Sequence, residues 1–168
     1  MPPSRRVRRS WREAAGRILG SWRVAVAEGS MLPTIAPGDW LLVDPTTRTW
    51  PRRGSVVVVR EPDTAVLSLK RVVAGPGDTV PFAEGWLRLA DDEAWLGADA
   101  SVETAAAAGF GAPRDSRRYG PVPLDLLVAR AWFRYVPWHR LGRLRRRQAV
   151  PNRGPVGPGR PAAPRLRR

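Results

Sequence analysis

Residues 66–78 read VLSLKRVVAGPGD, an apolar run with a strand-like pattern that ends at a Gly-Pro-Gly-Asp turn. Shortly before it, residues 56–59 are four consecutive valines between Gly54 and Pro62. Such a run of β-branched residues, bounded by turn formers, is typical of a strand that is buried on both faces. We therefore expect a mainly β fold built around these two segments.

The rest of the chain adds strands around this pair and two segments of another kind. A capping-box pattern, Ser10-Trp11-Arg12-Glu13, predicts a short helix over residues 11–19 that stops at Gly20. Residues 98–113 are rich in alanine and bounded by glycine, so they form either an inserted loop or a weak helix. Further strands are expected at residues 24–27, 40–43, 86–89 and 127–133.

The formal net charge of +14 is concentrated at the two ends of the chain. Residues 1–27 hold seven arginines and one acid, residues 140–168 hold ten arginines and no acid, and the part between holds twelve bases and fourteen acids. We therefore divide the chain into a basic arm with a short helix at 1–20, a single domain at 21–139, and a disordered Arg/Pro/Gly-rich tail at 140–168. Basic arms of this kind favour anionic partners, either lipid headgroups or nucleic acid.

The composition excludes several kinds of site. The chain has no cysteine, so thiol nucleophiles, thiolate metal sites and disulfides are excluded, and His139 alone cannot build a multi-histidine site. The acidic run at residues 91–93 is interpreted as a solvated turn rather than a metal site. The longest stretches without a charged residue are ten residues long, at 29–38 and 104–113, whereas a spanning helix needs about 20 apolar residues. We expect no transmembrane span.

Lys70 is the only lysine among 29 basic residues. A guanidinium keeps its proton near neutral pH, whereas a desolvated lysine amine can lose it and act as a general base. Ser30 lies forty residues upstream, in a turn framed by Gly29 and Pro33 that lets a substrate backbone come close. A serine in such a turn and a lone titratable amine suggest a Ser–Lys hydrolase. On position alone, an ordinary surface lysine in an arginine-biased composition is the alternative.

Two other hydrolase arrangements fit poorly. A Ser-His-Asp triad would have to use His139, which lies at the edge of the basic tail and is interpreted as a surface residue. The Ser-x-x-Lys arrangement of penicillin-recognising enzymes is excluded, because Leu67 occupies the position three residues before Lys70. The Ser30–Lys70 pair is therefore the arrangement we expect.

Three segments stand out as a set, and they occur in the order GSMLPT at 29–34, KRVVAGPGD at 70–78 and DSRRYGPVP at 115–123. Together they resemble the type I signal peptidase family of serine endopeptidases, and the lone lysine falls on the position of the family's general base. The resemblance covers residues 28–135. It implies a mainly β catalytic domain, no cofactor and no metal, and precursor substrates with small residues at the first and third positions before the scissile bond.

The resemblance also implies roles for individual residues. Ser30 is the expected nucleophile and Lys70 the expected general base. The backbone N–H of Ser30 helps to hold the oxyanion, while Gly29 and Met31 belong to the oxyanion and substrate-binding region. The expected supporting residues are Arg71, Asp115, Ser116 and Arg117. Among these, Asp115 pairs with Arg117 or Arg71 and holds the third segment against the dyad.

Three departures from the family pattern raise questions about the site. Many members have a serine two residues before the aspartate of the third segment, and its hydroxyl orients the lysine. Here that position is Pro113, so either Ser116, Ser68 or a water replaces the serine, or activity is low. Some members have a serine two residues before the nucleophile. Here that residue is Glu28, which would repel an oxyanion if it pointed inward. We also expect the family's usual N-terminal membrane anchor to be missing.

We therefore expect a signal-peptidase-type endopeptidase that removes an N-terminal signal or propeptide. Maturation of a nickel-type superoxide dismutase stays open, as does a catalytically degenerate binding protein, which the two substitutions at Pro113 and Glu28 would explain. A self-cleaving repressor is disfavoured, because residues 1–27, with one short helix, cannot hold a helix-turn-helix. The arms are expected to contact an anionic membrane surface rather than nucleic acid. The expected location is bacterial, either peripheral at the cytoplasmic membrane or cytoplasmic.

Overall fold

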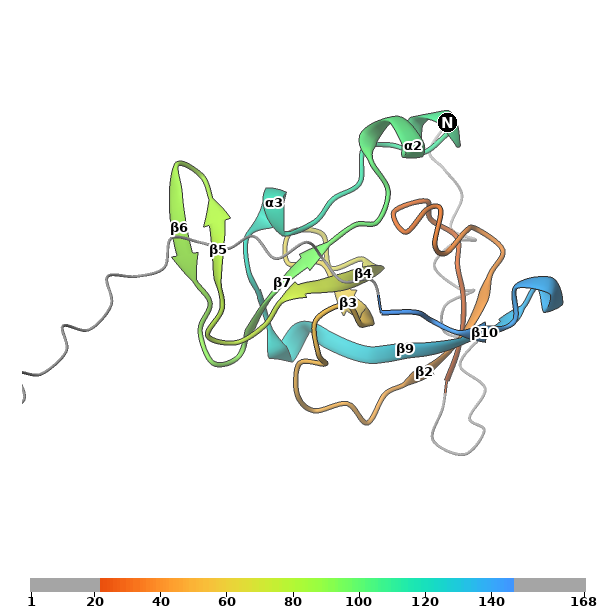
Figure 1. Ribbon diagram of the computed structural model, residues 1–168, viewed down its shortest axis with the longest axis horizontal. Coiled ribbons are helices and arrows are strands. Elements are labelled where there is room, and N and C mark those ends of the chain that lie inside the picture. The colour runs from red at the N-terminus through yellow and green to blue at the C-terminus, as the bar shows by residue number, and fades with distance from the viewer. Residues whose placement is uncertain (1–21, 147–168) are drawn as a thin grey trace, which may run out of the picture.

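The computed structural model describes residues 22–146, which form one antiparallel sheet and a separate ribbon of two strands (Figure 1). The strands of the main sheet are hydrogen-bonded in the order β1-β2-β9-β3-β4-β7-β8, and β10 pairs with β9. Their bounds are β1 Trp22–Ala25, β2 Trp40–Asp44, β3 Val56–Arg60, β4 Leu67–Ala74, β7 Glu93–Gly97, β8 Val122–Pro123, β9 Leu127–Val136 and β10 Gly142–Arg143. The ribbon consists of β5 Thr79–Phe82 and β6 Gly85–Arg88. The expectation of a mainly β fold is confirmed.

Strand β3 lies inside the sheet because its valines are apolar on both faces. All four residues from Val56 to Val59 are buried, and β9 and β4 flank the strand on its two sides. Val56 and Val58 join one core cluster, whereas Val57 and Val59 join a second cluster. This is the period-two alternation of a strand, and each fully buried valine contributes about 1.5–3 kcal/mol of hydrophobic stabilisation. The expectation of a strand buried on both faces is confirmed.

The register of β4 against β3 fixes the faces on which Lys70 and Arg71 lie. Lys70 is directly opposite Val57, and Arg71 is directly opposite Val56. Residues paired across an antiparallel ladder share a face, and neighbours along a strand alternate between faces. The two basic side chains therefore leave β4 on opposite faces.

Two short α-helices and two single turns of 3-10 helix complete the described part of the chain. Helix α2 spans Val102–Ala107, and the Ser101 hydroxyl caps it by accepting a hydrogen bond from the Thr104 backbone N–H. The helix lies inside the alanine-rich segment, where a loop and a weak helix were the two options. Helix α3 spans Ser116–Tyr119, and the 3-10 turns are η1 Leu124–Leu126 and η2 Trp138–Arg140.

The structure differs from the sequence expectations at several strands and at one boundary. Strands β5, β7, β8 and β10 were not expected, and β9 extends three residues further than expected. Strand β5 contains Pro81, which is tolerated because the two-stranded ribbon leaves each strand with a free edge. The boundary at residue 139 is too early for the sheet, because Gly142 and Arg143 pair with β9 and Leu144 packs on the core.

Some expectations fall on residues that the structure does not describe. These are the helix at 11–19, the basic arm at 1–20 and the part of the tail that follows residue 146. Within residues 22–146, no helix has the length and apolar character needed to cross a membrane. The acidic run at residues 91–93 forms a turn that leads into β7, and no group of acidic or histidine side chains in the described range is arranged to hold a metal ion.

Candidate active site

Ser30 lies in the loop that joins β1 to β2, and buried contacts hold this loop in place. Met31 and Ile35 are buried in the core cluster that also contains Val56 and Val58. The loop is closed at its base by two backbone hydrogen bonds, from Val26 N–H to the Asp39 carbonyl and from Gly38 N–H to the Val26 carbonyl. The nucleophile candidate is therefore carried on a packed turn rather than on an open loop.

Asp39 anchors the far end of this loop to β9, a function that the sequence did not reveal. Its side chain is almost fully buried and forms ion pairs with Arg134 at 3.0 Å and Arg140 at 3.2 Å. One carboxylate oxygen also accepts a hydrogen bond from the Ala36 backbone N–H at 3.0 Å. The Pro-Gly-Asp motif after the serine is therefore a structural element, because its aspartate joins segments that lie 95 residues apart.

The Ser30 side chain contacts the backbone of the strand that carries Lys70. Its Oγ donates a hydrogen bond to the Leu69 carbonyl at 3.2 Å, and the Leu69 backbone N–H donates to Glu28 Oε1 at 2.8 Å. The carbonyl of Ser30 accepts two further hydrogen bonds, from the backbone N–H groups of Asp99 and Ala100, each at 3.0 Å. The serine is therefore fixed between β4 and the segment that follows β7.

Lys70 is buried, but its surroundings are not purely apolar. Only 1% of its side chain is exposed, and its Nζ lies 3.4 Å from Glu61 Oε1. No hydrogen bond joins Ser30 Oγ to Lys70 Nζ within residues 22–146; the serine hydroxyl is instead directed at the Leu69 carbonyl. The burial of Lys70 agrees with the sequence expectation, whereas its carboxylate partner was missed.

The structure changes the expected roles of Gly29 and Met31. A Cβ added to Gly29 would lie 2.5 Å from Phe110 Cδ2, so the Phe110 ring packs directly on the backbone before the serine. Met31 is 1% exposed and belongs to the hydrophobic core. The expectation that Met31 lines a substrate groove is therefore wrong, because its side chain supports the turn from beneath.

Arg71 forms a buried ion pair that supports the serine turn from the other face of β4. Its Nε and Nη2 donate to the two carboxylate oxygens of Asp99 at 2.7 and 2.5 Å, and its Nη1 donates to the Gly54 carbonyl at 2.7 Å. The side chains of Arg71 and Asp99 are 4% and 5% exposed. Because the Asp99 N–H donates to the Ser30 carbonyl, this pair connects β4 to the nucleophile turn.

The third sequence segment, residues 115–123, contacts β7 and the residue Ala98 after it through Asp115 and Ser116. Asp115 caps α3 by accepting from the Arg117 backbone N–H, and its carboxylate forms an ion pair with the Arg117 side chain at 2.7 Å. The carboxylate also accepts from the Ala98 N–H at 3.1 Å, while Ser116 Oγ accepts from the Leu96 N–H at 2.9 Å. Asp115 therefore pairs with Arg117, and Arg71 pairs with a different acid.

Neither candidate for a lysine-orienting hydroxyl contacts Lys70. Ser116 Oγ is bonded to β7, and Ser68 Oγ is buried without a hydrogen-bond partner in the described part of the chain. The expectation that one of these hydroxyls replaces the serine absent at Pro113 is therefore not met. His139 is exposed, as expected, and no contact links it to Ser30 within the described residues.

Asp115 should make the stability of the protein depend on pH. Burial on its own would raise the pKa of Asp115, but hydrogen bonds from the Arg117 side chain and from the backbone N–H groups of Ala98 and Arg117 outweigh it, so the pKa is lowered from 3.8. A lowered pKa stabilises the fold above the unfolded value, and this contribution disappears as the pH falls through the folded value. We expect Asp115→Asn to lower the urea midpoint at pH 7, with a smaller difference from the unchanged protein at pH 3. Equal differences at both pH values would contradict this.

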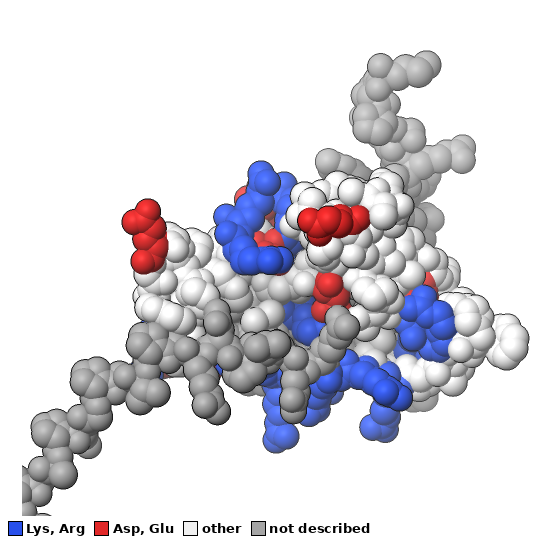
Figure 2. Space-filling model, turned by 45° about the horizontal axis from the view of Figure 1, so that its top comes forward, with Lys and Arg blue, Asp and Glu red and all other residues white. Residues whose placement is uncertain are grey.

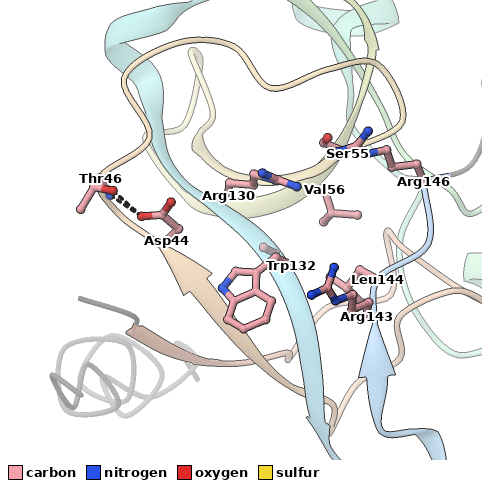
Figure 3. Close-up of a pocket in the computed structure, with 10 residues that line it drawn as sticks. Asp44, Thr46, Ser55, Val56, Arg130, Trp132, Arg143, Leu144 and Arg146 are labelled. Carbon is pink, nitrogen blue, oxygen red and sulfur yellow. Dashed lines mark hydrogen bonds between the residues drawn. The ribbon is translucent and has the colours of Figure 1, made fainter. Parts of the chain in front are cut away.

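A hollow of about 680 Å³ lies elsewhere on the sheet and shares no lining residue with the serine–lysine site. Its polar lining consists of Asp44, Thr46, Ser55, Arg130, Arg143 and Arg146, and its apolar lining of Val56, Ala131, Trp132 and Leu144 (Figure 3). Hydrogen bonds from Thr46, and to a smaller degree the charge of Arg130, lower the pKa of Asp44. Ser55 Oγ and Arg130 Nε have no hydrogen-bond partner among residues 22–146. The hollow is therefore cationic and polar.

Comparison with known proteins gives the family of the chain. Residues 16–105 match the family described as signal peptidase, peptidase S26, and this span contains Ser30 and Lys70 but ends before Asp115. The mitochondrial ATP-independent inner membrane protease subunit 1b of Arabidopsis thaliana is 31% identical over 119 residues, covering 68% of this chain and 70% of the relative. Signal peptidase I of Leptolyngbya laminosa is 28% identical over 139 residues, covering 68% of each chain. A further relative, mitochondrial inner membrane protease subunit 1 of Schizosaccharomyces pombe, is 30% identical over 116 residues, covering 61% of this chain and 68% of the relative. The family match extends over more than half of the chain, which therefore belongs to the signal peptidase family, peptidase S26, a family of serine peptidases that remove signal peptides.

Proposed function

We propose that the protein removes an N-terminal signal or propeptide from a precursor by attack of Ser30 Oγ on the scissile carbonyl, with Lys70 as the general base. One observation carries this assignment above all others. The only lysine of the chain is almost fully buried on β4, and the serine hydroxyl is hydrogen-bonded to the residue immediately before it. A buried amine on the strand that the serine hydroxyl contacts supports a Ser–Lys dyad.

The proposed reaction follows from these positions. The Ser30 hydroxyl turns from the Leu69 carbonyl toward Lys70 Nζ, which takes its proton as the Oγ–carbon bond forms. Lys70 then returns that proton to the departing amine as the peptide bond breaks, and water hydrolyses the acyl-serine by the same route. The Ser30 backbone N–H donates to no group in the described part of the chain, which supports its proposed use as an oxyanion donor.

The proposal is tested with synthetic peptides that contain a cleavage junction. The full chain should cleave a peptide with alanine at the first and third positions before the scissile bond, and it should cleave a matched peptide with bulky residues there far more slowly. A peptide spanning the propeptide junction of a nickel-type superoxide dismutase belongs in the same panel, and its selective cleavage would favour that maturation function. If no peptide were cleaved and Ser30→Ala changed nothing, the catalytically degenerate binding protein would be the better assignment.

We further propose that the arginine-rich end of the chain holds the enzyme at an anionic membrane surface. The segment 140–168 carries ten arginines, and Figure 2 shows Lys and Arg side chains side by side along the lower edge of the described domain in that view. Two arginines of this segment, Arg143 and Arg146, also line the cationic hollow. An arginine close to an anionic leaflet contributes about 1 kcal/mol, screened over a Debye length of about 10 Å at 0.1 M salt.

A chain that ends at residue 146 provides the test of this membrane contact. It retains β10 and Leu144, which belong to the folded sheet, and it loses six of the ten arginines. We expect its partitioning onto vesicles containing anionic lipid to fall about tenfold or more at low salt, while cleavage of a short soluble peptide stays unchanged. Vesicle sedimentation and peptide cleavage measure the two effects. Equal sedimentation of both chains, or indifference of the full chain to anionic lipid, would contradict the proposed tether.

A further inference from the structure

Glu61 and Lys70 form a buried pair of opposite charges at the candidate active site. Their side chains are 8% and 1% exposed, and Glu61 Oε1 lies 3.4 Å from Lys70 Nζ. Removing two charges from water is costly, so such a pair persists only where its geometry and further hydrogen bonds offset the desolvation. None of the sequence motifs includes Glu61, which follows directly after β3.

Several contacts hold the Glu61 carboxylate in position. Its second oxygen, Oε2, accepts a hydrogen bond from Thr64 Oγ1 at 3.0 Å and lies 3.6 Å from Arg114 Nε. The backbone of Glu61 is fixed as well, because its N–H donates to the Val66 carbonyl at 2.8 Å and its carbonyl accepts from the Ala65 N–H at 2.9 Å. One oxygen is therefore occupied by the β3–β4 loop and by Arg114, which leaves the other directed at Lys70.

The β3–β4 register explains why Glu61 and Lys70 meet. Val57 and Val59 share a face of β3 with the position of Glu61, two residues further along, and Lys70 is directly opposite Val57. The two side chains therefore leave the hairpin on the same face and reach toward each other along it. On that face Ser68 lies between them in β4, but its hydroxyl bonds neither side chain.

We propose that Glu61 is the positioning residue that holds Lys70 Nζ toward Ser30 and sets the pH range in which Lys70 can accept a proton. This rests on the proposed function, in which Lys70 is the base. A carboxylate accepts an N–H from lysine in both protonation states, so it can orient the amine before and after proton transfer. Its negative charge also stabilises the ammonium form. The charge of Glu61 therefore acts against the transfer of a proton away from Lys70.

Glu61 is one of several charged groups in this part of the fold. The Tyr119 hydroxyl shows the effect of these charges. Burial first, and then the charges of four carboxylates, raise its pKa. These carboxylates come from three elements: the β3–β4 loop, the serine turn and the cap of α3. They are Glu61, Asp63, Glu28 and Asp115. Arg114 offsets part of this negative field through its ion pairs with Glu61 and Asp63. Of the carboxylates, only Glu61 has an oxygen within ion-pair distance of Lys70 in the described part of the chain.

The single lysine allows a direct test that does not depend on activity. Because Lys70 is the only lysine, the full chain labelled with 13C at lysine Cε gives one side-chain resonance, whose shift follows the ionisation of Lys70. We expect Glu61→Gln, which keeps the size and one acceptor but removes the charge, to lower the titration midpoint of that resonance by about 1–3 pH units, the effect of an opposite charge within about 4–6 Å. The exposed Glu103→Gln makes the same chemical change on α2 and should leave the midpoint unchanged.

The acid limb of the pH–kcat profile is the second readout. The acid limb should move to lower pH in Glu61→Gln by the same amount as the titration midpoint of the resonance. Glu61→Leu should in addition lower the maximal kcat about tenfold or more with little change in KM, because the amine loses its orienting acceptor. Glu61→Asp should restore part of that loss. Coincident midpoints in the unchanged protein and in folded Glu61→Gln would overturn the role of Glu61. Cleavage that survived Lys70→Arg would instead overturn the proposed function and leave the resonance measurement intact.

Discussion

Substitution of Lys70 by arginine is expected to lower kcat for peptide cleavage by at least about 10³-fold, while the fold stays intact. Arginine retains a positive charge that can still pair with Glu61, so the buried carboxylate keeps a partner. A guanidinium does not lose its proton in the working pH range, so it cannot take the proton of Ser30. The variant thus separates the charge of Lys70 from its ability to act as a base. The measurement is kcat on the alanine-containing peptide, with circular dichroism and the thermal midpoint as checks of the fold.

A matched set of variants makes this result specific. Ser30→Ala should lose activity to the same extent, and the double variant should be no worse than either single one, because groups that act as a unit are not additive. Arg60→Lys, on the exposed last residue of β3, adds a second lysine at the surface and should leave cleavage unchanged. Substantial activity in Lys70→Arg would show that another group serves as the base.

The largest expected loss of stability comes from Arg71→Met. Removing the guanidinium leaves the Asp99 carboxylate buried without its partner and leaves the Gly54 carbonyl without a donor. Breaking a buried ion pair on one side typically costs about 3–5 kcal/mol. We expect a loss of that size in the free energy of unfolding, measured by urea denaturation. Activity should fall as well, because the Asp99 backbone N–H supports the Ser30 carbonyl.

An exposed ion pair in the same protein provides the control. Arg53 and Asp78 lie 3.0 Å apart, with side chains that are 41% and 42% exposed. Exposed pairs contribute about 0–1 kcal/mol, so Arg53→Met should change the urea midpoint only slightly. The double variant Arg71→Met with Asp99→Leu should recover part of the stability lost in Arg71→Met, because it removes the unpaired charge. Similar losses for the buried and the exposed pair would contradict this account of Arg71.

The sequence predicted the parts of the site that depend on local pattern. The strand that carries Lys70 and the turn that carries Ser30 follow from apolar periodicity and turn residues, and the structure has both as expected. The valine run was likewise sufficient to predict a strand covered on both faces.

The partners of these residues depend on register and topology, which local pattern does not give. Counting every second residue from Val57 gives the face of β3 on which Glu61 lies. That this is also the face of Lys70 follows only from the register between β3 and β4. Asp39 meets Arg134 only because β9 pairs with β2, a contact between distant parts of the chain. Met31 was misassigned because a motif gives the position of a side chain in sequence and not the direction in which it points.

The place of β9 in the sheet has a consequence for biosynthesis. Strand β2 follows the serine loop, and strand β3 pairs with β4, which carries the lysine. Strands β2 and β3 do not pair with each other, because β9 lies between them and pairs with both (Figure 1). Residues 127–136 are made late in translation, so a nascent chain that already contains Ser30 and Lys70 still lacks the strand that joins β2 to β3. We therefore expect a chain that ends before residue 127 to cleave no peptide, because it lacks the strand that joins β2 to β3.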